Sequence, residues 1–191
     1  MGYPWVEGRD DSPWEVEANA PPLEYGEPAP RPANIINIDE VEHEHFEDIV
    51  EEAPLATRDR SILAGLHWQK ISAGHRGCVP HCHALEEEIF VVLDGTATLE
   101  LWPSPVRLAA GDANEEIPIR AGHVVARPPG TRVSHSFRAG PDGVTLLVYG
   151  TRETNDICWY PRSNKIYWRG IGVIGRIEQL EYSDGEPDED A

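Results

Sequence analysis

The chain has 191 residues and a mass of 21.3 kDa, which fits one domain with extended ends. Its formal charge of −18 is uneven, because residues 1–55 hold 15 acidic residues against two arginines and residues 178–191 hold seven against none, whereas residues 56–177 hold 12 against 14 basic residues. Acidic ends repel nucleic acid and anionic membranes, so we expect neither as a partner.

Targeting and redox signals are weak. No stretch approaches the roughly 18 consecutive apolar residues of a membrane span. The N-terminus lacks a basic region followed by an apolar one, so we expect a cytoplasmic protein. Three cysteines are an odd number. Cys78 and Cys82 would lie about 13 Å apart on an extended strand, so we expect reduced thiols.

Charge, proline content and strand-like patterning divide the chain into four segments. Residues 1–55 are acidic and proline-rich and predict an extended N-terminal arm, in which 39–52 is a helical turn or an irregular segment. Residues 56–151 predict a β-barrel. Residues 152–182 are aromatic-rich, with glycines within 170–175, and predict an irregular cover or an edge pairing on that barrel. Residues 183–191 predict a disordered acidic tail.

The barrel prediction rests on short strand-like runs separated by turn signals. The pair Asp94-Gly95 between two apolar runs indicates a hairpin. Many short strands at near-regular spacing are typical of an all-β sandwich or barrel. The runs are SILAGLHWQKI, GCVPHCH, EIFVVLDGTATLELW, PVRLA, EEIPI, HVVARP, SHSFRAG and VTLLVYG.

The stretch PHCHALEEEIFVVLDG, residues 80–95, carries the chemistry. Alternate residues of a strand share a face, so His81 and His83 project together, about 6.6 Å apart. Glu88 opens the next strand on the face of Phe90 and Val92. A carboxylate facing an apolar interior needs a partner, because an unpaired buried charge costs several kcal/mol. This pattern predicts a metal ion.

His135 is the fourth candidate ligand. It follows the turn Pro128-Pro129-Gly130 on a strand-like run. Three histidines and one carboxylate suit one divalent transition metal, such as Mn, Fe, Co, Ni, Cu or Zn, with positions left for water or substrate.

These motifs resemble those of the cupin superfamily. Its first motif, G-x5-H-x-H-x3–4-E-x6-G, is similar to His81-Cys82-His83, four residues, Glu88, six residues and Gly95. The second motif, G-x5-P-x-G-x2-H-x3-N, is similar to residues 122–135, although four residues separate Gly130 from His135 and the closing Asn is absent. The resemblance covers roughly residues 60–150. It implies a double-stranded β-helix (a jelly-roll-like barrel), an interior metal held by His81, His83, Glu88 and His135, and a homodimer.

Competing residues remain for the site. Glu87 is the rival ligand at three-residue spacing, but the run to Gly95 selects Glu88, which leaves Glu86 and Glu87 exposed. His43 and His45 also spell H-x-H, but in an acidic segment without strand patterning, so we expect solvated side chains. Residues on strand-like stretches that could line a cavity are Trp68, Lys70, Arg132 and Tyr149.

Three functional hypotheses follow. The first is a metal-dependent enzyme acting on a small polar metabolite by isomerase, lyase or dioxygenase chemistry. The second is a non-catalytic barrel that binds or senses a small molecule. The third is a barrel whose metal only stabilises the fold.

Overall fold

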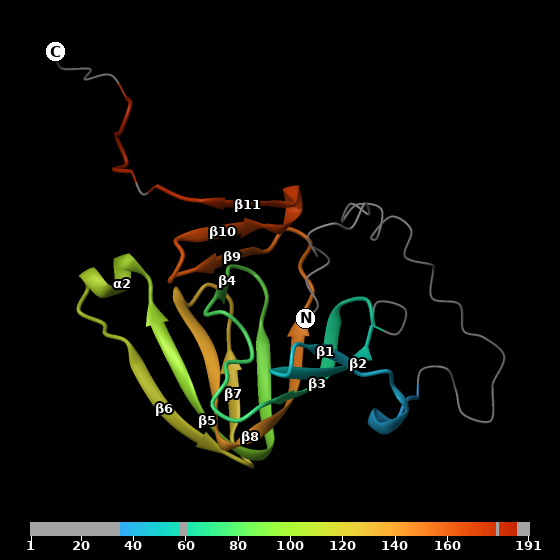
Figure 1. Cartoon of the computed structure of the whole chain (residues 1–191). Helices are drawn as coiled ribbons and strands as arrows, with labels where there is room; N and C mark the ends of the chain where they lie inside the picture. Colours follow the sequence, from blue (N-terminus) through green and yellow to red (C-terminus); the bar gives the residue numbers. More distant parts are fainter. Residues whose placement is uncertain (1–34, 58–60, 179, 187–191) are drawn as a thin grey trace.

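The computed structural model describes residues 35–57, 61–178 and 180–186, which form two antiparallel sheets (Figure 1). This confirms the all-β prediction. Within these residues, no helix is long and apolar enough to cross a bilayer. The larger sheet has the order β1-β2-β3-β8-β5-β6, with β7 also paired to β5. Its strands are β1 (Glu44–Phe46), β2 (Val50–Ala56), β3 (Ala64–Ile71), β5 (Glu88–Pro103), β6 (Glu115–Arg120), β7 (Val124–Arg127) and β8 (Val133–Thr151).

The hydrophobic core lies against the inner face of this sheet. Strands β5 and β8 pair along nearly their whole lengths and alternate buried apolar side chains with more exposed ones, as half-buried strands do. The buried core cluster consists of Ile71, Phe90, Val92, Ala97, Leu99, Ile119, Phe137, Ala139, Val144, Leu146 and Val148.

Asp94-Gly95 is not a hairpin turn, which corrects the sequence prediction. Both residues lie inside β5, where the register with β8 shifts on either side of them. Gly95 has φ +75, and a Cβ there would lie 2.3 Å from the carbonyl oxygen of Gly143. The pair therefore forms a bulge that bends a continuous strand, a role that also favours glycine.

Of the two alternatives predicted for the C-terminal extension, an irregular cover or an edge pairing, the structure has strand pairing. β9 (Ile157–Tyr160), β10 (Lys165–Trp168) and β11 (Val173–Arg176) form a meander that pairs with β4 (Cys82–His83), in the order β11-β10-β9-β4. Figure 1 shows this smaller sheet across one end of the larger one. Gly172 has φ +66 after the 3-10 helix η2 (Arg169–Ile171), so it serves the turn between β10 and β11.

The N-terminal boundary also differs from the prediction. β1 and all but the last residue of β2 lie within residues 1–55, and β2 pairs with β3, so the larger sheet begins before residue 56. The 3-10 helix η1 (Ile38–Glu40) precedes them. Residues 1–34 of the predicted arm and 187–191 of the predicted tail lie outside the described residues.

The run PVRLA is a short helix, α2 (Pro105–Ala109), where the sequence suggested a strand. Pro105 stands at the start of this helix. Proline is well suited to that position, because its missing N–H would have no intrahelical partner there.

Candidate metal centre

The backbone brings the four predicted ligands to one place. His83 lies in β4, Glu88 is the first residue of β5, and His135 lies in β8. His81 is bridged to His135 by two backbone hydrogen bonds, since each amide donates to the other residue's carbonyl oxygen, at 3.2 and 2.9 Å. The spacing within the strands and this bridge bring together side chains that are up to 54 residues apart in the sequence.

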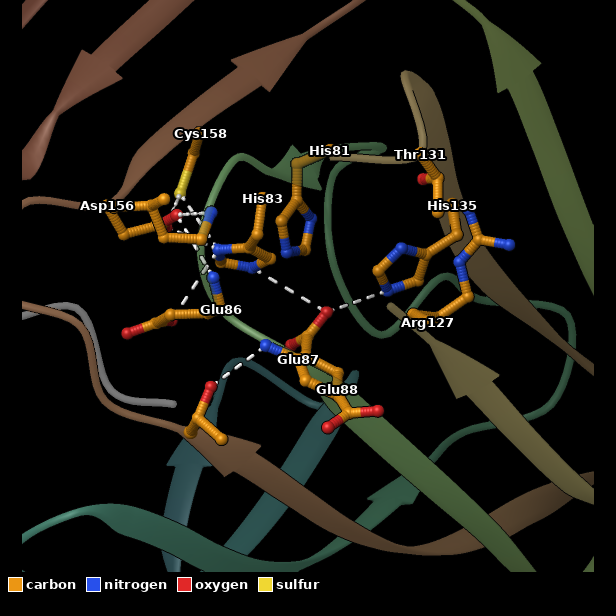
Figure 2. A network of polar contacts seen from close by, with 12 residues as sticks. His81, His83, Glu86, Glu87, Glu88, Arg127, Thr131, His135, Asp156 and Cys158 are labelled. Atoms are coloured by element: carbon orange, nitrogen blue, oxygen red, sulfur yellow. Dashed lines mark hydrogen bonds and ion pairs between the residues drawn. The ribbon is translucent and has the colours of Figure 1, made fainter. Parts of the chain in front are cut away.

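The four side chains converge inside the barrel (Figure 2). His81, His83 and Glu88 each offer one ligand atom, and these atoms all lie within 4.8 Å of one another. The Glu88 Oε2 atom is 3.6 Å from His83 Nε2 and 3.2 Å from His135 Nε2. The His81 ring centroid is 5.1 Å from that of His135. All four residues are at most 5% exposed.

Three of the converging atoms are buried without a hydrogen-bond partner: His83 Nε2, Glu88 Oε2 and His135 Nε2. His81 Nδ1 lies 2.8 Å from the Val79 carbonyl oxygen, which directs Nε2 to the ligand role. Buried polar atoms without partners are costly, and a cation would satisfy them together. Three imidazole nitrogens and one carboxylate oxygen are donors suited to a divalent transition metal, so these residues fit such an ion.

For His81, His135 and Glu88, the electrostatics favour the protonation states that metal ligands need. Burial lowers the pKa of His81 to about 3 and also lowers that of His135, so both rings are neutral at pH 7. Burial by itself would raise the pKa of Glu88, but the neighbouring histidines outweigh it and hold that pKa below its usual value. A neutral imidazole and an ionised carboxylate are the forms that bind a metal.

His83 is oriented from behind by Asp156, which the turn before β9 supplies. The Asp156 Oδ2 atom lies 2.6 Å from His83 Nδ1, and Oδ1 accepts from the Leu85 amide at 2.9 Å. Burial lowers the pKa of His83, but the contacts with Asp156 and Cys158 and the charge of Glu88 outweigh it and raise that pKa to about 11. A metal at this centre would therefore take the place of the proton on Nε2. A carboxylate on Nδ1 fixes the tautomer and leaves Nε2 facing the centre. The sequence prediction missed Asp156.

Glu86 is fully buried, which corrects the expectation that it is exposed. Its carboxylate contacts the Arg169 guanidinium of η2 and accepts from the Glu153 amide at 2.9 Å. Arg169 also lies 3.9 Å from Asp156 Oδ2. Glu87, the rival ligand, donates its amide to the Thr151 hydroxyl and does not join the cluster.

None of the four residues suggested as cavity-lining lines the cavity that the structure has among its described residues. In β3, Gln69 and Ile71 are buried, so Trp68 and Lys70 occupy the opposite, outer face. Tyr149 alternates in the same way with buried Val148, and Arg132 is exposed in a turn. A strand register that is wrong by one residue reverses every face, which explains these errors.

The second H-x-H pair and the three cysteines lie outside the predicted ligand set. His43 Nδ1 lies 2.6 Å from Glu51 Oε1, and His45 is exposed in β1, so the second H-x-H does not join the cluster. Cys78, Cys82 and Cys158 are free. Burial raises the pKa of the Cys78 thiol to about 12 and also raises that of Cys158, so neither is a thiolate at pH 7.

Comparison with known proteins gives a fold. No protein-family model and no curated protein matches the sequence. A solved structure from Acidithiobacillus ferrooxidans, assigned as a sugar phosphate isomerase, is 23% identical with a TM-score of 0.59, over 78% of this chain and 97% of that one. A sugar phosphate isomerase from a cupin superfamily, from Silicibacter pomeroyi, is 19% identical with a TM-score of 0.60, over 80% and 95%.

A predicted oxalate decarboxylase from Thermotoga maritima is 22% identical with a TM-score of 0.50, over 62% of this chain and 99% of that one. These likenesses, together with the antiparallel barrel, show that this chain has the cupin fold. The resemblance seen in the motifs of residues 81–95 and 122–135 is therefore confirmed at the level of the fold.

Proposed function

We propose that the protein is a metal-dependent cupin enzyme that acts on a small polar metabolite. The observation that carries this proposal is the convergence of three buried ligand atoms, from His83, Glu88 and His135, that have no hydrogen-bond partner and lie beside His81. A site that only stabilised the fold would need no access for a ligand. A cavity of about 320 Å³ adjoins the centre without including a candidate ligand in its lining; the lining residue Val133 is two residues from His135 on the same strand.

A bound metal would supply Lewis-acid or, with a redox-active ion, oxygen chemistry at this centre. The protein's own residues hold and orient the groups of this centre. His81, His83, Glu88 and His135 would hold the ion, and Asp156 keeps the proton of His83 on Nδ1. Burial of all four ligands keeps bulk water away from their donor atoms. Isomerisation and decarboxylation are named for the structural neighbours, and both are candidate reactions here, as is dioxygenation.

The direct test is elemental analysis of protein purified without a nickel column, next to the His81→Ala/His83→Ala double variant. We expect a near-stoichiometric transition metal that the double variant loses. The metal-loaded protein is then assayed for turnover of a panel of small hydroxy and keto acids and sugar phosphates. A protein that takes up no metal even after reconstitution would overturn the proposal. Metal uptake without turnover would favour a binding or sensor barrel.

A further inference from the structure

A cavity of about 320 Å³ opens at the end of the barrel next to α2. Its walls include Leu101 and Pro103 of β5 and Val133 of β8. Leu101 packs against the core, and alternate residues of a strand share a face, so Pro103 lies on the inner face too. Val133 shares its face with His135 for the same reason. These walls of the cavity therefore belong to the inner face of the barrel, whereas Arg107 and Glu115, which also line it, are exposed.

Two strand registers connect this cavity to the candidate metal centre. Leu101 lies opposite His135 in the β5–β8 pairing, and Glu88 lies opposite Arg127 in the β5–β7 pairing. Directly opposed residues have Cβ atoms about 5 Å apart. Arg127 lines the cavity, and Figure 2 shows its side chain beside His135. None of the four candidate ligands lines the cavity itself, so Leu101, Arg127 and Val133 are the lining residues that adjoin the centre.

Arg127 has unused hydrogen-bonding capacity. Its Nη2 donates to the Val133 carbonyl oxygen at 2.5 Å, whereas its buried Nε has no hydrogen-bond partner. A guanidinium carries five N–H donors, and leaving a buried one unpaired is costly. None of the ion pairs found among the described residues involves Arg127. Burial lowers the pKa of this guanidinium, which remains charged at pH 7.

The other charged groups that line the cavity are either ion-paired or exposed to solvent. Arg107 forms an ion pair with Asp112, so these two lining charges offset each other. Glu115 lines the cavity but is exposed to solvent, where its charge is screened. Arg127 is therefore the charged group that faces the inner part of the cavity without a carboxylate in contact with it.

We propose that Arg127 is an anion-binding residue of this cavity, and that the ligand of the metal centre carries a carboxylate or phosphate group. A guanidinium fork matches the oxygen pairs of both groups and binds them through charge-assisted hydrogen bonds. Thr131 also lines the cavity, and its hydroxyl contacts the Val133 backbone, donating to the carbonyl oxygen at 3.5 Å and accepting from the amide at 3.4 Å. The anion would be fixed by Arg127 while the rest of the molecule reaches the centre at His135 and Glu88. The catalytic consequence rests on the proposed function, but the binding does not.

The test measures binding, not turnover. Full-length protein, in metal-loaded and in metal-free form, is titrated with propionate, with glycerol phosphate, and with the neutral analogues propionamide and glycerol. Ligand-detected NMR gives the Kd of each. Arg127→Gln and Arg127→Lys are compared with Arg120→Gln, which removes the same charge from an exposed position on β6. Circular dichroism and metal content are recorded for each sample, so that a folding or metal defect is recognised.

We expect at least one anion to bind at least tenfold more tightly than its neutral analogue. Arg127→Gln should weaken this binding at least tenfold, Arg127→Lys should weaken it less, and Arg120→Gln should leave it within twofold. Preference for propionate or glycerol phosphate separates a carboxylate from a phosphate ligand. Equal anion binding by wild type and Arg127→Gln, or no anion binding by the wild type, overturns the proposal. Because Kd is also measured on metal-free protein, a failure of the metal-enzyme proposal leaves this result readable.

Discussion

The Asp156 carboxylate lies 2.6 Å from Nδ1 of His83, a residue 73 positions earlier in the chain. This contact joins the smaller sheet to the candidate metal centre, because Asp156 immediately precedes β9 and His83 belongs to β4, the strand that β9 pairs with. The C-terminal extension is thus part of the centre as well as a cover over it. The charge and geometry of one candidate ligand depend on a segment outside the two sequence motifs.

Asp156→Asn should weaken metal binding by about 10- to 100-fold while the protein stays folded, as is typical when the partner of a metal-bound histidine is lost. The asparagine keeps an oxygen for the Leu85 amide but loses the negative charge that orients His83. Metal affinity is measured by competition with a chromogenic chelator. Glu153→Gln is the control, because it removes a charge from an exposed neighbour three residues away. Equal affinities of Asp156→Asn and Glu153→Gln would show that Asp156 has no part in metal binding.

Glu88→Ala and Glu87→Ala form a matched pair that tests the ligand set. The two glutamates are adjacent and their substitutions change the net charge equally, but the Glu88 carboxylate lies 3.2 Å from His135 Nε2, whereas Glu87 does not join the cluster. We expect Glu88→Ala to lower metal occupancy at neutral pH and Glu87→Ala to leave it unchanged, as read by elemental analysis. A loss of metal in Glu87→Ala alone would transfer the ligand role to the rival residue.

The sequence predicted the parts of the centre that local geometry determines. His81 and His83 share a face through strand alternation, and the spacing to Glu88 and Gly95 resembles a known motif. Asp156, Arg169 and Arg127 could not be found in this way, because each reaches the centre or its cavity through pairing of distant strands or packing of the smaller sheet. The faces of β3 were reversed for a related reason, since register depends on tertiary pairing.

Gly95→Ala tests the bulge that replaced the predicted hairpin. The added Cβ would meet the Gly143 carbonyl oxygen at 2.3 Å, a backbone atom that cannot move aside cheaply. Gly74 has the same φ of +75 with nothing near its Cβ position, so Gly74→Ala carries the backbone strain without the clash. We expect Gly95→Ala to cost about 2 kcal/mol or more in the free energy of unfolding, and clearly more than Gly74→Ala. Urea denaturation compares the two, and equal costs would mean that the close approach of β5 and β8 does not matter.

The buried pair of Glu86 and Arg169 should be a large contributor to the attachment of the smaller sheet. Arg169→Met removes the guanidinium that contacts the fully buried Glu86 carboxylate and leaves His83 Nδ1, at 3.5 Å, as its nearest cationic partner; breaking a buried pair costs up to about 3–5 kcal/mol. Adding Glu86→Gln should recover much of that loss, because the neutral amide can still accept from the Glu153 amide. Arg162→Met, which removes an exposed charge from the same region, should change stability by less than about 0.5 kcal/mol. The free energies of unfolding are measured in urea for all four proteins, with the wild type included. If the double variant is no more stable than Arg169→Met, the buried charge on Glu86 is not the cause of the loss.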